Sequence, residues 1–152
     1  MKPEDFLKRS QAYLKNLQDL STKAVKVGLP KEKSSSRVYG DGTTVLEVGA
    51  AHEYGAGVPV RSFLRTPFAI KRKEINKVID RQFVKLLDGE TSADTALGLV
   101  GVTALNISRG AFTTKGYGTW MDISEETKEA KGSSQILIDS GILRASLTWS
   151  IE

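Results

Sequence analysis

The spacing of hydrophobic positions along the chain predicts three long helices. Residues 4–22 carry apolar side chains at helical intervals among charged ones. Residues 67–87 repeat this pattern, and one face of that helix is expected to hold Phe68, Ile75, Ile79, Phe83 and Leu86. Residues 93–108 are apolar nearly all round. A helix of that kind is central to a core or to a subunit contact.

Shorter patterns predict two strands and two turns. Residues 23–30 alternate between apolar and polar positions and end in glycine and proline, which predicts a strand. Near the other end, residues 136–141 predict a turn and residues 142–146 a short helical turn. Residues 146–152 alternate again, so a second strand is expected there.

The segment 43–55 begins like a strand, because threonine and valine crowd its start, but its ends favour a helix. Thr44 and Glu47 have the spacing of a capping box, in which each side chain bonds the other residue's backbone N–H. Gly55 lies where a helix commonly ends in a left-handed residue. We therefore expect a helix over residues 45–54.

Three segments predict loops. Residues 31–42 are polar and rich in serine and glycine, and within them Arg37–Tyr39 could pair briefly with a strand. Residues 55–65 are expected to be extended, because Pro59 disfavours helical geometry at the residue before it. Residues 109–135 are polar and glycine-rich and predict a surface excursion.

Together these elements predict an α+β fold: about three main helices packed on a small, mostly antiparallel sheet, with long polar loops. The chain has 152 residues, 39% of them hydrophobic, which is enough to build the core of a single domain, residues 1–152. It has no cysteine, so disulfides and thiolate metal sites are excluded. No apolar run approaches the roughly 20 residues that span a membrane, and no membrane partner is expected.

The charge pattern leaves nucleic-acid contact open. The formal net charge is +4, and one row of basic residues is expected on much of the polar face of the second long helix: Lys73, Lys77, Arg81 and Lys85. Such a row could face phosphate groups. Glu74 and Asp80 dilute it, so a solvated amphipathic helix is the competing interpretation.

Enzymatic chemistry has little support. His52 is the chain's one histidine, and its spacing from Ser62 and Asp139 matches no known triad pattern. On a helix, His52 and Glu53 would point about 100° apart, so a shared ligand geometry is not expected. No glycine motif for binding phosphate and no metal-ligand spacing is present. We expect no enzyme activity, no cofactor and no metal.

The segment "PVRSFLR" is the best candidate for a contact surface. In an extended segment Arg61, Phe63 and Arg65 would share one face, while Ser62 and Leu64 would share the other, with Leu64 buried. Arginine beside an aromatic ring is typical of protein contact surfaces. The competing interpretation is an edge strand with an intramolecular pair between arginine and a carboxylate.

Two separated stretches resemble a known family. "AAHEYG" and "VPVRSFLR" (residues 50–65) are similar to a signature of small tailed-bacteriophage proteins, the tail-completion or virion-morphogenesis family. Residues 127–151 resemble that family's closing pattern, most of which lies in the stretch "ILIDSGILRASL" (residues 136–147). The two stretches occur in the family's order and spacing, and the resemblance extends over nearly the whole chain.

The resemblance implies a structural virion protein, found in the neck or tail and in the host cytoplasm during assembly. It implies a ring, typically six-fold, between the head-closure protein and the tail-terminator or tail-tube protein, with genomic DNA passing through the lumen. A tail-terminator or other minor tail role is the alternative within this class. Residues 31–43 and 110–134 would be partner-contacting arms, and the aromatic candidates in the second arm are Tyr117 and Trp120.

Overall fold

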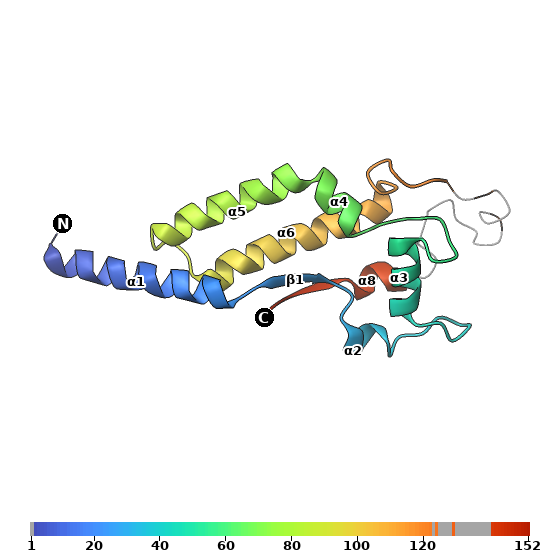
Figure 1. Cartoon of the computed structure of the whole chain (residues 1–152), viewed down its shortest axis with the longest axis horizontal. Helices are drawn as coiled ribbons and strands as arrows, with labels where there is room; N and C mark the ends of the chain where they lie inside the picture. Colours follow the sequence, from blue (N-terminus) through green and yellow to red (C-terminus); the bar gives the residue numbers. More distant parts are fainter. Residues whose placement is uncertain (1, 123, 125–128, 130–140) are drawn as a thin grey trace. The chain divides into compact units, whose positions relative to one another are not determined.

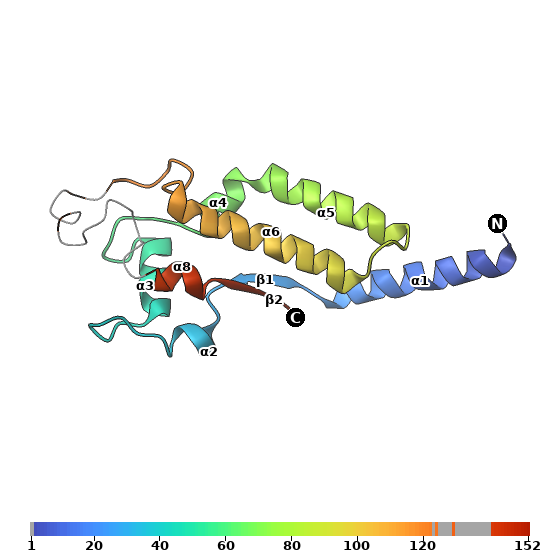
Figure 2. The same ribbon diagram turned by 180° about the vertical axis from the view of Figure 1, so that it is seen from behind.

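The computed structural model of the chain describes residues 2–122, 124, 129 and 141–152. Over these residues it is helix-rich, with seven helices and one antiparallel sheet of two strands, as Figures 1 and 2 show from opposite sides. This is a small α+β fold, so the predicted fold class is confirmed. Within the described part of the chain, no helix is both long and apolar enough to cross a membrane.

The elements follow one another in a simple order. The helices are α1 (Pro3–Thr22), α2 (Lys31–Ser34), α3 (Val45–Tyr54), α4 (Arg65–Ile70), α5 (Arg72–Leu87), α6 (Ala93–Thr113) and α8 (Ile142–Ser146). The strands are β1 (Val25–Gly28) and β2 (Thr148–Ile151). The predicted first helix, both strands and the helical turn at residues 142–146 are therefore confirmed.

The sheet joins segments that are far apart in the sequence. Beside the strands, the backbone N–H of Ala24 donates to the carbonyl of Glu152 at 2.6 Å, and the N–H of Glu152 donates to the carbonyl of Ala24 at 2.9 Å. This reciprocal pair is the pattern of antiparallel pairing. The Lys26 ammonium adds an ion pair with the Glu152 carboxylate.

The chain divides into two compact units, each with its own internal packing. Unit 1 comprises Met1–Lys26, Arg72–Ala104 and Trp149–Glu152. Unit 2 comprises Val27–Lys71 and Leu105–Thr148.

In unit 1, the second half of α1 packs against the end of α5 and the start of α6. Leu20 contacts the small buried cluster of Leu86, Ala93 and Ala96. The Asn16 amide donates to the carbonyl of Leu86 at 3.4 Å. No residue of α1 is buried, so this helix is held along one side only.

Trp149 of β2 lies against α6 at a position that requires glycine. A Cβ added to Gly101 would be 2.6 Å from the Trp149 ring, closer than real Cβ atoms approach other heavy atoms. A Cβ added to Gly98, about one helical turn earlier, would be 3.3 Å from the same ring. These glycines therefore make the flat surface on which the indole ring of unit 1 packs.

In unit 2, α3 approaches its neighbours closely because it carries a glycine. A Cβ on Gly49 would be 2.4 Å from Leu29 and 3.3 Å from Leu143 of α8. Val45, one turn earlier on α3, is fully buried, and Leu143 is 2% exposed. The buried face of α3 therefore packs against α8 across a glycine.

The ends of α3 are as the sequence predicts. The Thr44 hydroxyl accepts from the N–H of Glu47 at 3.2 Å, and the Glu47 carboxylate accepts from the N–H of Thr44 at 2.8 Å, which completes the capping box. Gly55 has φ 77°, the left-handed conformation in which many helices end. The predicted helix over residues 45–54 is confirmed.

Two predicted helix boundaries are wrong. The single helix over residues 67–87 is in fact α4 and α5, separated at Lys71, whose φ of −93° and ψ of 13° are not helical. Nothing in the local sequence signals this break. In contrast, α6 continues to Thr113, well past residue 108, because Ala111 and Phe112 are buried in unit 2.

The predicted apolar face of α5 is also wrong in part. Leu86 is buried and so is the polar Gln82, whereas Ile79 is 43% exposed and Phe83 is 46% exposed. The buried face is therefore rotated around the helix axis relative to the predicted one. Two large apolar side chains of the predicted face remain on the surface.

The predicted loops are more ordered than expected. Residues 31–34 form α2, whose Ser34 is fully buried, and Val38 forms an isolated bridge with Thr44, so the brief pairing predicted for residues 37–39 is confirmed. After α6, residues 114–119 form turns and most of them are exposed, whereas Trp120 is 6% exposed and attaches this segment to the interior. Residues 136–140 of the predicted turn lie outside the described residues.

The capping box predicts a dependence of stability on pH. Hydrogen bonds from the hydroxyl and then the backbone N–H of Thr44 lower the pKa of Glu47 below its usual 4.5. A lowered folded pKa stabilises the fold above the unfolded pKa, and that stability is lost as the pH falls through the folded pKa. We expect urea unfolding at a series of pH values from neutral to acidic to show this loss.

Glu47→Gln should reduce this pH dependence, because its amide has no charge to titrate. Glu90→Gln is the matched control, since Glu90 is exposed and lies outside any capping box. Equal pH dependence in the two variants would contradict the assignment to Glu47.

Candidate functional site

The candidate site is built around a carboxylate that α3 places in the interior of unit 2. Val45, Gly49 and Glu53 are buried at intervals of four residues, so they share one face of α3. Glu53 is 3% exposed. A buried carboxylate is costly unless it is well hydrogen-bonded, so its partners determine what it does.

The Glu53 carboxylate accepts hydrogen bonds from four consecutive residues. One oxygen accepts from the Ser62 hydroxyl at 2.8 Å and the Arg65 N–H at 3.0 Å. The other accepts from the N–H groups of Phe63 at 2.9 Å and Leu64 at 3.1 Å. We call Glu53 and residues 62–65 the Glu53 hub. The backbone donors at the start of α4 are thus satisfied by a side chain from another helix.

Arg65 adds the charge that balances this carboxylate. Its Nε donates at 3.1 Å to the Glu53 oxygen that also accepts from the Ser62 hydroxyl. A terminal nitrogen of the guanidinium donates to the backbone carbonyl of Glu53. The guanidinium also lies 4.7 Å from the centre of the Tyr54 ring. The intramolecular arginine–carboxylate pair considered from the sequence is therefore present.

Two other side chains donate hydrogen bonds to the backbone carbonyl groups of the same segment. The Ser108 hydroxyl of α6 donates to the carbonyl of Phe63 at 2.7 Å. The indole N–H of Trp120 donates to the carbonyl of Ser62 at 3.0 Å. The N–H groups and the carbonyls of this short segment are thus both fixed by side chains.

An aromatic cluster packs beside the hub. The Phe63 ring, 1% exposed, lies 5.5 Å from Phe112, and Phe112 meets Trp120 edge to face at 5.6 Å. Pairs of this geometry stabilise by about 1 kcal/mol beyond the burial of their area. Phe63 and Trp120, predicted as interface candidates, are therefore part of the interior of unit 2 in the single chain.

The predicted alternation along residues 61–65 is wrong. Arg61, Ser62 and Phe63 are consecutive buried residues, and Leu64 is only partly buried. No strand forms here, because the backbone N–H groups bond to a carboxylate rather than to a neighbouring strand. The segment is a structural joint instead of a two-faced contact strand.

Arg61 is an unusual buried cation. It is 8% exposed, and its Nε has no hydrogen-bond partner among the described residues. Burial lowers the pKa of its guanidinium below the usual value. Its backbone N–H donates to the carbonyl of His52 at 2.8 Å, which ties the segment to the last turn of α3. The Glu53 carboxylate bonds to residues 62–65, and none of these hydrogen bonds involves Arg61.

Tyr117 and its neighbours fold back onto the end of α6. Its hydroxyl donates to the carbonyl of Ile107 at 2.9 Å, and the Lys71 ammonium lies 5.1 Å from the centre of its ring. Tyr117 has φ 56°, which is uncommon for a residue with a side chain. The start of the predicted second arm is therefore attached to unit 2, whereas residues 123, 125–128 and 130–134 lie outside the described residues.

The basic row on α5 is exposed as predicted. All four of its members are solvent-accessible: Lys73, Lys77, Arg81 and Lys85. They follow one another at intervals of four residues, so their charges lie along one side of α5.

The candidates for chemistry are not brought together. The Ser62 hydroxyl donates to Glu53, and the N–H of Thr66 donates to the same hydroxyl at 2.9 Å, so Ser62 has a structural role. Asp139 lies outside the described residues. In the described part of the chain, no group of three or more histidine, aspartate or glutamate residues could hold a metal ion.

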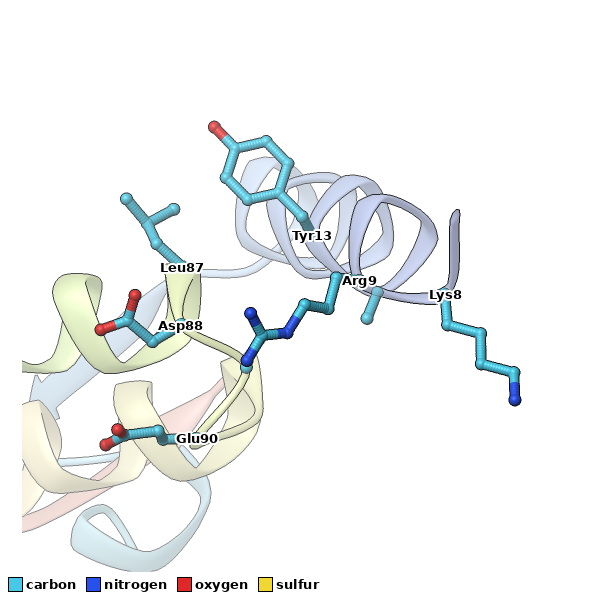
Figure 3. Close-up of a pocket in the computed structure, with 8 residues that line it drawn as sticks. Lys8, Arg9, Tyr13, Leu87, Asp88 and Glu90 are labelled. Carbon is cyan, nitrogen blue, oxygen red and sulfur yellow. The ribbon is translucent and has the colours of Figure 1, made fainter. Parts of the chain in front are cut away.

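A surface cleft of about 620 Å³ lies in unit 1, where the first half of α1 passes the turn after α5 (Figure 3). Lys8, Arg9, Ala12 and Tyr13 line it from α1, and Leu87 and residues 88–90 line it from the turn. Its lining combines basic residues of α1, acidic residues of the turn and apolar groups from both.

Comparisons with models of protein families, with curated proteins and with solved structures give no match. The resemblance to the phage family therefore rests on the two sequence stretches themselves. Residues 50–65 of the first stretch are all described, and most of them belong to α3 and the hub. Of the second stretch, residues 141–147 are described and form mainly α8.

The role of Glu53 is not predicted from the sequence, where Glu53 enters only as a residue that does not share a ligand geometry with His52. In the structure its carboxylate organises the segment that follows. One signal could have found it: Val45, Gly49 and Glu53 recur every four residues, which places the glutamate on the apolar face of its helix. Ser108 and Phe112 carried no comparable signal.

Glu53→Gln should lower the free energy of unfolding by about 3 kcal/mol or more, since breaking a buried charged network leaves its partners unpaired. The substituted amide presents N–H groups to donors that need an acceptor. Urea unfolding followed by circular dichroism measures the change. Glu47→Gln, an exposed glutamine substitution on the same helix, is the control and should cost much less. Equal losses in the two variants would contradict the hub.

Proposed function

We propose that this chain is a structural protein of the neck of a tailed-bacteriophage virion. In this role, copies of the chain form a ring, expected to be hexameric, that joins the head-closure protein to the tail tube and completes the tail. Genomic DNA passes through the lumen of the ring. The chain acts by contact and shape rather than by catalysis.

The observation that carries the proposal is the pair of family-like stretches in order, residues 50–65 and 136–147. The geometry of the first stretch is consistent with it. Its polar groups bond to one another, since Glu53 takes the Ser62 hydroxyl and the Arg65 guanidinium. Residues engaged in this way support a rigid building block better than they support a reaction.

The surface of α5 supports the part of the proposal that concerns DNA. Its four exposed basic side chains are suited to a passage for DNA, because they offer charge to phosphates without reading base sequence. A tail-terminator or other minor tail role remains the alternative within the same class. These roles differ in which ring the protein meets.

Electron microscopy of lysates from a phage that encodes this chain, with its gene deleted, tests the proposal. We expect full heads and finished tails that stay separate, because the joint between them is missing. Complementation with the wild-type chain is the control and should restore joined particles. Missing or overlong tails would indicate the alternative tail roles, and normal infectious particles would overturn the proposal.

The exposed basic row also favours a second candidate, a nucleic-acid-binding module. This function predicts affinity for duplex DNA that falls steeply as salt rises from about 50 to about 200 mM. Changing Lys73, Lys77, Arg81 and Lys85 to glutamine should abolish it, as measured by fluorescence anisotropy. The matched control changes four exposed lysines elsewhere: Lys2, Lys8, Lys15 and Lys31. Equal effects of both sets, or no salt-dependent binding, would exclude this candidate.

A further inference from the structure

In the described part of the chain, the positive charge of Arg61 has no negative charge paired with it. The residue is 8% exposed, yet it takes part in none of the ion pairs that the described residues form. Its Nε is buried without a hydrogen-bond partner. Charged side chains buried to this degree are normally paired, because removing a charge from water is costly. The packing of unit 2 alone therefore does not explain Arg61.

Glu53 does not supply the missing charge, because its carboxylate is fully engaged elsewhere. One oxygen accepts from the Ser62 hydroxyl, the Arg65 N–H and the Arg65 guanidinium, and the other accepts from two further backbone N–H groups. The negative charge of Glu53 is balanced by the positive charge of Arg65. The hub is thus neutral without Arg61, and the Arg61 guanidinium adds one uncompensated positive charge.

Other arginines of unit 2 show what Arg61 lacks. The Nε of Arg109 is also buried without a partner, but one of its terminal nitrogens donates to the carbonyl of Leu147 at 2.8 Å. Arg37 donates to the Ser146 hydroxyl at 3.2 Å. Each of these guanidinium groups has an acceptor within the chain. The Arg61 guanidinium has none among the described residues, so its donors need an acceptor from elsewhere.

The backbone around Arg61 is fixed on both sides. Its own N–H donates to the carbonyl of His52 at 2.8 Å. The next residue, Ser62, is held at its hydroxyl by Glu53 and at its carbonyl by Trp120. Such a backbone positions the guanidinium before any ligand arrives, which reduces the entropy lost on binding.

One end of the guanidinium is accessible to a ligand. Unlike Nε, the terminal nitrogens of Arg61 are not closed off from solvent. The preceding residue, Val60, is 56% exposed, so Arg61 lies where the chain passes from the surface into the interior. Because Arg61 itself is only 8% exposed, its surroundings admit a single small group better than an extended polyanion.

The chemistry of the guanidinium defines the class of ligand. Its N–H groups form a planar fork that matches two oxygens of a carboxylate or of a phosphate group. We propose that Arg61 is the receptor for an oxyanion, a carboxylate or phosphate group that comes from outside the chain and binds end-on to the two terminal nitrogens. The ligand supplies both the missing negative charge and the missing acceptors. This site goes beyond the neck role proposed above and does not depend on it.

Burial of Arg61 strengthens such a contact. It lowers the pKa of the guanidinium below its usual value, which reflects the cost of holding an unpaired charge away from water. The same weak solvation increases the attraction between the guanidinium and an anion that reaches it. An oxyanion at this position therefore relieves an unfavourable feature of the free chain.

Thermal unfolding in sodium phosphate or sodium acetate, each titrated against sodium chloride at equal ionic strength, tests the site. Phosphate stabilises many folded proteins through exclusion from their surface, so the informative quantity is the difference between variants. At about ten times the dissociation constant, the oxyanion should raise the unfolding midpoint of the wild type by about 3 °C or more beyond its effect on Arg61→Met. Arg72→Met is the matched control, since Arg72 is exposed, and it should respond like the wild type.

In sodium chloride alone, Arg61→Met should unfold at no lower a temperature than the wild type. Methionine fills a similar length of buried space without an uncompensated charge, and such replacements are often neutral or stabilising. An arginine that was paired within its own chain would give the opposite result, because its removal would leave a buried partner without a donor.

Nuclear magnetic resonance of the wild type follows the contact without depending on the folding of a variant. The guanidinium signals of Arg61 should move and saturate as the oxyanion is added, whereas those of Arg72 should not. Acetate stands for the carboxylate of a partner protein, and phosphate stands for a free ion or a phosphate ester. The anion that saturates at the lower concentration identifies the source.

A saturable response to either anion that Arg61→Met abolishes and Arg72→Met retains would support the site. Three results would each refute it: Arg61 signals that stay still with both anions, an equal rise of the midpoint in Arg61→Met, or a clear loss of stability of Arg61→Met in chloride.

Discussion

The structure of unit 2 depends on one buried carboxylate. Burying Glu53 would be unfavourable by several kcal/mol if its charge were unpaired, and the chain offsets this with the Ser62 hydroxyl, three backbone N–H groups and the Arg65 guanidinium. These bonds fix the segment between α3 and α4. The backbone N–H groups of this segment have no partner in a helix or sheet, so without Glu53 they would need water as their acceptor. The carboxylate therefore serves as the partner that the start of α4 lacks.

The hub also determines how the neighbouring aromatic residues pack and where α6 ends. With the segment fixed, Phe63 points into the interior, where Phe112 and Trp120 pack beside it. This burial explains why α6 runs on to Thr113, since its last turn carries Phe112. The family-like stretch "HEYG…VPVRSFLR" is thus mostly a folding element.

The elements that could be predicted are those whose signals are local. The capping box at Thr44, the left-handed Gly55 and the alternation around β1 each operate within a few residues, and the structure has all three. The site could not be predicted in the same way, because Ser108 reaches Phe63 across 45 positions and Trp120 reaches Ser62 across 58. Burial of Arg61 and Phe63 likewise arises from these distant contacts, and a period-two pattern cannot detect them.

The two units differ in how completely they cover their apolar residues. Phe63, Leu143 and Leu147 of unit 2 are each at most 2% exposed, whereas the buried apolar cluster of unit 1 contains Leu86 and two alanines. Small clusters stabilise little, because the hydrophobic contribution follows the area removed from water. Unit 1 also leaves large apolar side chains of α1 and α5 exposed. Unit 2 is thus organised around a buried polar hub, whereas the surface of unit 1 retains large apolar side chains.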